Sequence, residues 1–256
     1  VTGKMAAALI SCIHKSGVKS IIATNKDRNA LKNLKSKFKK IKTTTDNVEA
    51  VKNSDIVFIC VKPQDFDEVL NEIKNEIKNQ LVVSIAAGIK IKHIEKILGK
   101  RRIIRVMPNI NCLVGEMAAG FSAGAYATKE DTRIVEELLN CAGISFLIKE
   151  ELIDALSAIS GAGPAFFAYF IDAIAKAGIK NGLSKEIAHR LAAKTALGTG
   201  KLLLEKNISP NELISMVASK KGITLAGLEV LDKNGVNKIL EKTIHAAIKR
   251  SKELGK

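Results

Sequence analysis

The order of hydrophobic and polar residues divides the chain into two halves with different predicted structures. Up to residue 149, short runs rich in β-branched residues alternate with longer amphipathic stretches, the pattern of βαβ units around a parallel sheet. The predicted strands are residues 20–23, 56–61, 81–85, 103–106, 118–123 and 145–148, and the predicted helices are residues 4–16, 28–39, 66–78, 91–98 and 129–141. We therefore expect residues 1–149 to form an α/β domain of the doubly wound, Rossmann-like type.

From about residue 150 onward, strand-like alternation is not visible in the sequence. Four helical runs are predicted there instead, at residues 151–178, 184–206, 210–219 and 223–255. Ser184 is a predicted N-cap, and Pro210 stands at a first helical position behind Ser209. A polar cluster at residues 149–154 indicates a hinge, so residues 150–256 are expected to form an all-α C-terminal domain.

The apolar helices of this second half need a surface to pack against. The densest apolar run, residues 155–175, is interrupted by Gly161, Gly163 and Pro164, which favours a buried helix over a membrane span. A segment of roughly 100 residues cannot build a thick core alone. We therefore expect a homodimer built by the second half, and no membrane partner.

A glycine turn at the start of the chain indicates a dinucleotide site. Residues 1–6 read V-T-G-K-M-A and fit the end of G-x-G-x-x-G/A, with Val1 in place of the first glycine. A glycine without Cβ lets backbone N–H groups approach a pyrophosphate, and the helix N-terminus that follows adds partial positive charge. The candidate cofactor contacts are Gly3, Lys4, Met5 and Ala6. A Rossmann sheet has its central first strand before this turn, so we expect that strand in residues preceding Val1.

The ends of later strands should meet at the same edge of the sheet, where dinucleotides bind. After the strand at residues 20–23, an enzyme specific for NAD would place an acidic residue; Asn25, Lys26 and Arg28 stand here instead. Because cations suit a 2′-phosphate, the predicted cofactor is NADPH, with NADH as the weaker alternative. The next two strands end in the further candidate contacts Val61, Lys62, Pro63, Ala86, Ala87 and Gly88.

The composition of the chain limits which kinds of partner it is expected to bind. The chain has 41 Lys and Arg against 26 Asp and Glu, a net charge of +15, but the lysines are dispersed and only eight Phe, two Tyr and no Trp could stack on bases. A solvated basic surface is therefore favoured over nucleic-acid binding. The four cysteines have no close spacing, so we expect reduced thiols and no metal site. No secretory leader is visible, and a cytoplasmic location is expected.

Several longer motifs carry a resemblance over essentially the whole chain. Residues 61–64 read V-K-P-Q, residues 84–88 S-I-A-A-G, residues 105–109 R-V-M-P-N, and residues 160–165 S-G-A-G-P-A. In these motifs the chain resembles the pyrroline-5-carboxylate reductases, although that family usually continues the third motif with T-P, where Ile110 and Asn111 stand here. The resemblance implies NADPH-dependent reduction of 1-pyrroline-5-carboxylate to L-proline, the last step of proline biosynthesis. It also implies that Asn47 contacts the cofactor, and that the chain forms dimers or larger rings of dimers.

The substrate loop of that family resembles residues 219–227, S-K-K-G-I-T-L-A-G, with Lys220 and Lys221 replacing the usual proline and first glycine. Free N–H groups at the start of the helix after Gly222, including that of Ile223, would form an anion site for the substrate carboxylate. Candidate substrate-binding residues are Ser219, Gly222, Ile223 and Thr224, and the Thr224 hydroxyl is the candidate catalytic group that bonds the ring nitrogen. The alternative is a Ser/Thr helix cap.

Two other functions remain open. Another Rossmann-plus-helical NADP dehydrogenase, of the 3-hydroxyacid type, would place a catalytic lysine in the long helix of its second domain. Lys176 is the nearest candidate, at the far end from Pro164, which argues against that class. A non-catalytic NADPH-binding regulatory protein would account for Lys220 and Lys221. Turnover of 1-pyrroline-5-carboxylate distinguishes such a protein from a reductase.

Overall fold

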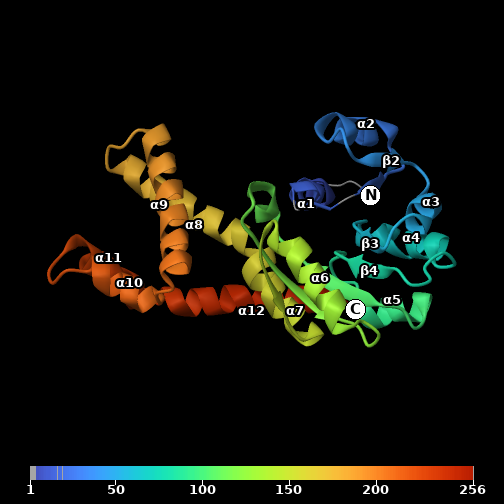
Figure 1. Ribbon diagram of the computed structural model, residues 1–256. Coiled ribbons are helices and arrows are strands. Elements are labelled where there is room, and N and C mark those ends of the chain that lie inside the picture. Colours follow the sequence, from blue (N-terminus) through green and yellow to red (C-terminus); the bar gives the residue numbers. More distant parts are fainter. Residues whose placement is uncertain (1–3, 16, 19, 256) are drawn as a thin grey trace. The chain divides into compact units, whose positions relative to one another are not determined.

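The computed structural model describes residues 4–15, 17–18 and 20–255, coloured along the chain in Figure 1. The chain forms two units, and each is described by itself. The sheet unit comprises Val1–Ala162 together with Ala247–Lys256, and the helical unit comprises Gly163–Ala246. The last turns of the C-terminal helix therefore belong to the sheet unit.

The described strands form two separate sheets. β1 (Ile22–Thr24) and β2 (Lys42–Thr44) make a parallel pair. The second sheet has the order β3-β4-β5-β6-β7, with β3 (Ile56–Ile59), β4 (Leu81–Ser84), β5 (Ile103–Met107), β6 (Met117–Ala123) and β7 (Gly143–Leu147). Its neighbours are parallel except β5 and β6, where Ile104 lies opposite Ala123 in an antiparallel ladder. The predicted α/β class is confirmed, with one antiparallel pair added.

The core of the sheet unit lies on both faces of the five-stranded sheet. All four residues of β4 are buried, and they alternate: Val82 joins the apolar cluster on one face, while Leu81 and Val83 join the cluster on the other. Helices α4 (Phe66–Ile73) and α5 (Ile91–Leu98) cover the first face with apolar residues at helical spacing. Burial on both faces explains why the strands of this sheet read as nearly continuous apolar runs.

The other helices of the sheet unit are α1 (Lys4–Lys15), α2 (Arg28–Lys37), α3 (Asn47–Lys52), α6 (Lys129–Asn140) and the short α7 (Ile153–Leu156). Short 3₁₀ turns lie at Pro63–Asp65, Ile110–Val114 and Glu150–Leu152, and a π turn at Ser157–Gly161. Side chains of Asp27, Asp46 and Thr128 cap α2, α3 and α6, which satisfies N–H groups that a helix start leaves free.

The helical unit contains α8 (Gly163–Lys180), α9 (Lys185–Lys206), α10 (Pro210–Val217), α11 (Ile223–Lys233) and most of α12 (Val236–Leu254). The predicted caps are confirmed: the Ser184 side chain accepts from the N–H of Ile187, and Ser209 forms a capping box before Pro210. The predicted single run at residues 223–255 is wrong in one respect. It is divided at Gly235, whose φ of 65° ends α11 and starts a new helix.

The six predicted strands are all present, with bounds shifted by at most two residues. Two elements were not predicted, β2 and α3, which have three and six residues. They are too short for a periodic pattern to distinguish them from a loop.

The helical unit exposes much of its apolar surface. Its buried cluster consists of small residues, Ala175, Ala188 and Ala192, while Tyr169 and Met216 are 73% and 70% exposed. By length and composition alone, the helical stretch Glu150–Lys180 is long and apolar enough to cross a membrane. An apolar face of this extent needs a covering surface, whether a membrane or another protein chain.

Candidate functional site

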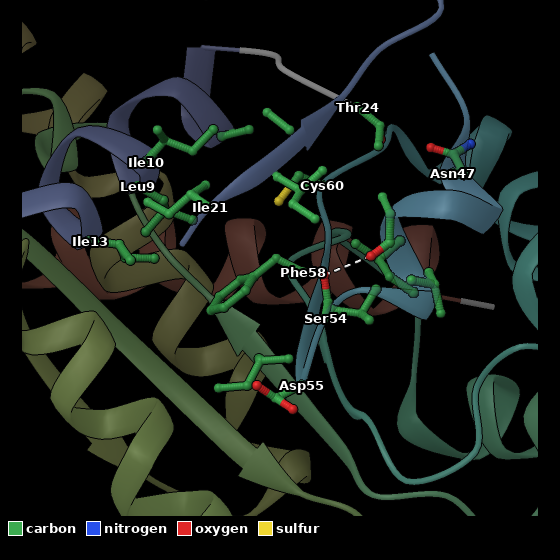
Figure 2. Close-up of a pocket in the computed structure, with 18 of the residues that line it drawn as sticks. Leu9, Ile10, Ile13, Ile21, Thr24, Asn47, Ser54, Asp55, Phe58 and Cys60 are labelled. Carbon is green, nitrogen blue, oxygen red and sulfur yellow. Dashed lines mark hydrogen bonds between the residues drawn. The ribbon is translucent and has the colours of Figure 1, made fainter. Parts of the chain in front are cut away.

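A cavity of about 500 Å³ lies in the sheet unit between β1 and β3. Apolar side chains of α1, including Leu9, Ile10 and Ile13, form one wall, and Phe58 and Cys60 of the β3 segment form another (Figure 2). In the part of the chain that the structure describes, no strand pairs with the edges of β1 and β3 that face this cavity. A Rossmann sheet has its first strand at this position, between the second and the fourth.

Two predicted cofactor residues, Asn47 and Val61, line the cavity near the carboxyl ends of β1 and β3. Thr24, which was not predicted, also lines it, and Figure 2 shows Thr24 and Asn47 at the same end. Asn47 is the first residue of α3, directly after its cap Asp46. The order of strand ends deduced from the sequence therefore brings these residues to one edge, where an open parallel sheet binds its ligand.

The turn after β1 is shaped by its own polar groups. The side chain of Asn25 accepts from the N–H of Asp27 at 2.9 Å. The Asp27 carboxylate accepts from the N–H of Asn29 at 2.8 Å as the cap of α2, so it is engaged with the backbone. Lys26 is exposed, and its Nζ lies 2.7 Å from Oε1 of Glu68. That hydrogen bond, with the charge of Glu68, holds the pKa of Lys26 above its usual value.

Asn47 also has a partner on α4. Its Nδ2 donates to Oε2 of Glu72 at 2.9 Å. The partners Glu68 and Glu72 were not predicted as site residues. Their spacing of four residues within a predicted helix is a signal for a shared face, but their partners lie 42 and 25 residues away in sequence.

The segment after β3 turns sharply. Val61 is buried, Lys62 is exposed, and Pro63 begins the 3₁₀ turn that leads into α4. Proline suits this first helical position because its missing N–H would have no partner there.

The turn after β4 consists of small residues, and a hydrogen bond from its backbone to a buried side chain fixes it. The buried Ser84 hydroxyl accepts from the N–H of Ala86 at 3.3 Å. Ala87 is exposed, and Gly88 has a φ of 79°. A Cβ on Gly88 would lie 2.9 Å from the carbonyl oxygen of Leu254 at the end of α12, so the position requires glycine on both counts.

The glycine turn at the start of the chain is only partly described. Gly3 and the side chain of Lys4 lie outside the described residues. Met5 is half-buried, and Ala6 is buried in the first turns of α1 and lines the cavity. The small Ala6 allows α1 to pack closely beside the strands.

The predicted substrate loop lies in the helical unit. Gly222 is the N-cap residue of α11, and no side chain caps that helix within the described residues. The N–H of Gly222 donates to the carbonyl of Ser219 at 3.0 Å, which closes a tight turn. Ile223 is 94% exposed and Thr224 is half-buried.

Lys221 departs from ordinary backbone geometry in this loop. Its φ of 60° is left-handed, and this is the position where the resembling family has glycine. A lysine in that conformation carries a steric cost, since its Cβ approaches the following carbonyl. The loop therefore keeps the glycine-type turn without the glycine.

Among the described residues, no group of three or more His, Cys, Asp and Glu is placed to hold a metal ion. The four cysteines are free, and burial raises the pKa of both the Cys60 and Cys112 thiols to about 11. These thiols are therefore protonated at neutral pH. They read as interior groups, not as nucleophiles.

These strand ends fit a nicotinamide dinucleotide. Small residues that leave the backbone accessible follow β4, an amide begins α3, and a cation stands in the turn after β1. Fold and site together define a two-unit reductase of the Rossmann type, with a dinucleotide-binding sheet unit and a helical unit. The family models agree with both parts. Residues 2–88 match NADP oxidoreductase, coenzyme F420-dependent, and residues 150–254 match pyrroline-5-carboxylate reductase dimerisation.

The chain belongs to the pyrroline-5-carboxylate reductase family. It is 39% identical to the pyrroline-5-carboxylate reductase of Methanosarcina acetivorans over 259 residues, 99% of this chain and 96% of the relative. A solved pyrroline-5-carboxylate reductase from Coxiella burnetii has a TM-score of 0.95 and 32% identity, covering 99% of this chain and 96% of the other. A pyrroline carboxylate reductase from Plasmodium falciparum, solved with NADP bound, has a TM-score of 0.85 and 30% identity, covering 99% and 95%.

Proposed function

We propose that this chain reduces 1-pyrroline-5-carboxylate to L-proline with NADPH, the last step of proline biosynthesis. The observation that carries the proposal is the near full-length similarity to reductases of this name, which includes both the cofactor half and the helical half. The test is loss of NADPH absorbance with purified protein and 1-pyrroline-5-carboxylate, together with detection of proline. No turnover with correct folding and intact NADPH binding would contradict the proposal and favour a non-catalytic regulatory protein.

The proposed cofactor contacts are the residues at the strand ends and the glycine turn. The turn after β1 would hold the ribose end, where the Lys26 cation suits a 2′-phosphate. The small residues after β4 would leave space for the nicotinamide ring. The full set is Gly3, Lys4, Met5, Ala6, Asn25, Lys26, Asn47, Val61, Lys62, Pro63, Ala86, Ala87 and Gly88.

The proposed substrate contacts are Ser219, Gly222, Ile223 and Thr224. The N-terminus of α11 offers N–H groups without a side-chain cap, and these would bind the carboxylate of the substrate. The Thr224 hydroxyl would donate to the ring nitrogen. Because α11 has 11 residues, its dipole adds to the attraction for the anion.

The bound cofactor supplies the hydride that reduces the imine carbon. The nitrogen takes up a proton as the C=N double bond becomes a single bond, so the product is the cyclic amine. The chain's own contribution is to orient the ring and to stabilise the nitrogen as its basicity develops. Thr224 is the proposed group for that role.

The helical unit is proposed to build a homodimer, either alone or within a larger ring of dimers. Support comes from the family match of residues 150–254 and from the exposed apolar residues of α8 and α10, such as Tyr169 and Met216. A second copy would cover the apolar stretch Glu150–Lys180. The charged residues Asp154, Asp172 and Lys176 within this stretch favour a protein surface over a membrane as its cover. We propose a cytoplasmic protein without membrane or nucleic-acid partners.

We also propose residues 1–149 as the dinucleotide-binding domain and residues 150–256 as the domain for substrate and dimerisation. A 3-hydroxyacid dehydrogenase is less well supported. Lys176, its candidate catalytic lysine, lies 2.6 Å from Asp172 in an exposed i,i+4 ion pair, the arrangement of an ordinary helix surface.

A further inference from the structure

Two carboxylates of α4 bind two of the polar residues proposed as cofactor contacts. Glu68 lies 2.7 Å from the ammonium of Lys26, and Glu72 accepts at 2.9 Å from the amide of Asn47. Glu68 and Glu72 are one helical turn apart, so they present one acidic face to the turn after β1 and the start of α3. The turn's own acidic residue, Asp27, is engaged as the cap of α2, so the carboxylate that pairs with Lys26 comes from a different element.

The charge of Glu68 affects the two cofactors differently. NADPH carries a 2′-phosphate of about −1.5 to −2 charge at neutral pH, whereas NADH carries a hydroxyl at the same position. A phosphate that approaches Lys26 has to exchange with the carboxylate and is then repelled by it. A hydroxyl is not repelled, and it can donate a hydrogen bond to a carboxylate.

The surroundings of Lys26 reinforce this asymmetry. Asp65 and Glu72 also act on Lys26, in the same direction as Glu68. The ammonium that would attract the 2′-phosphate therefore stands near three acidic side chains, of which Glu68 is the one in direct contact.

We infer that Glu68 is a specificity-determining residue that lowers the preference of this chain for NADPH over NADH, because it pairs with Lys26. This inference rests on the proposed function, since it takes the turn after β1 as the place where the 2′ position is recognised. It assigns to α4 a role in cofactor selection beyond its packing against the sheet.

The test is Glu68→Gln, which keeps the shape and removes the charge. Calorimetric titration of the purified protein with NADPH and with NADH gives the ratio of the two dissociation constants. We expect the ratio to move toward NADPH by roughly 3- to 10-fold, the effect of one charge on a phosphate a few ångströms away in water. Because both side chains are exposed, the change should shrink at high salt.

Asp67→Asn is the matched control. It removes the same charge from the neighbouring position of α4, but the Asp67 carboxylate lies 2.6 Å from Nε2 of His93 and not at Lys26. Its ratio should stay at the parent value. An equal shift of the ratio in both variants would show that the effect comes from the overall charge of the protein, and it would overturn the inference.

Lys26→Asp separates the inference from the proposed function. If Lys26→Asp favours NADH while Glu68→Gln leaves the ratio unchanged, the ribose turn stands and the role of Glu68 is refuted. If Lys26→Asp leaves the ratio unchanged, the proposed ribose turn is wrong and the inference falls with it. In a Lys26→Met background only the direct repulsion between Glu68 and the phosphate remains, so the effect of Glu68→Gln should shrink; an undiminished effect would overturn the pairing.

Discussion

Gly88 lies directly against the backbone of Leu254, although 166 positions separate them: a Cβ on residue 88 would come within 2.9 Å of the Leu254 carbonyl oxygen. Gly255 is also close to this turn, since a Cβ on Gly255 would lie 3.3 Å from the carbonyl oxygen of Gly88. The last turn of α12 therefore supports the turn after β4. The hydroxyl of Ser251, in the same last turn, donates to Asp154 at 2.6 Å and fastens the helix end within the sheet unit.

Gly88→Ala should therefore destabilise the protein and weaken NADPH binding. The left-handed φ alone costs about 1–2 kcal/mol for a residue with a Cβ, and the contact with Leu254 adds to that because a backbone carbonyl cannot move aside cheaply. Thermal unfolding and NADPH titration measure the two effects.

Gly115→Ala is the control for this prediction, because Gly115 has a left-handed backbone with a similar φ of 78° but nothing within 4 Å of an added Cβ. It should lose stability by the strain alone and keep its NADPH affinity. Equal losses in the two variants would show that α12 does not support the turn.

The apolar surface of α8 provides a second prediction. Tyr169→Lys should convert dimers to monomers at micromolar concentration, since an exposed aromatic residue of the helical unit would become a charge in the interface. Sedimentation velocity measures the change. Tyr126→Lys is the matched control, the other tyrosine of the chain, which is 44% exposed in the sheet unit. A Tyr169→Lys protein that still sediments as the parent does would exclude this face of α8 from the interface.

The buried thiol of Cys112 should make the free energy of unfolding depend on pH. Its side chain is buried, and burial raises the pKa of the thiol to about 11, with a further contribution from nearby Cys12. The unfolded thiol releases its proton near its reference pKa of about 8.5–9, while the folded thiol keeps it. This contribution to stability is therefore fully present below about pH 8.5 and is lost as pH rises toward 11, by about 1.4 kcal/mol per pH unit.

The measurement is unfolding free energy between pH 8 and 10.5 for the parent and for Cys112→Ala. The variant loses some packing at every pH, but its stability should fall less steeply because the buried thiol is gone. Parallel slopes would show that Cys112 does not titrate as burial requires.

The sequence predicts those parts of the fold that depend on local pattern. Helix α5 has the bounds that the sequence predicts, because apolar residues recur there at helical spacing; in the structure Gly99, with a positive φ, ends the helix. The division at Gly235 is not predicted because the amphipathic helical pattern continues on both sides of it. The pairing of Lys26 with Glu68 depends on how α4 packs beside the turn after β1. The pattern of residues along the chain does not predict that these two side chains, 42 residues apart, lie in contact.

Thr224 provides the sharpest prediction about the reaction. If its hydroxyl bonds the ring nitrogen, that bond strengthens as hydride arrives and the nitrogen becomes more basic. Its removal should then slow the chemical step as well as weaken substrate binding. A charge-assisted hydrogen bond contributes about 1.5–3 kcal/mol, so Thr224→Val should lower kcat/KM by roughly 10- to 150-fold.

Valine keeps the shape of threonine, and Gly222, not Thr224, is the N-cap residue of α11, so the melting temperature and NADPH affinity of Thr224→Val should change little. Thr243→Val is the matched control. Thr243 is a half-buried helical threonine on α12 whose hydroxyl donates to the carbonyl of Ile239, and its loss should leave kcat/KM unchanged. Melting temperature, NADPH affinity and steady-state rates measured on both variants decide the role of Thr224. A Thr224→Val protein that melts about as early as a helix-cap mutant, with a stability loss of about 1 kcal/mol, but turns over normally would make Thr224 a structural residue and refute the assignment.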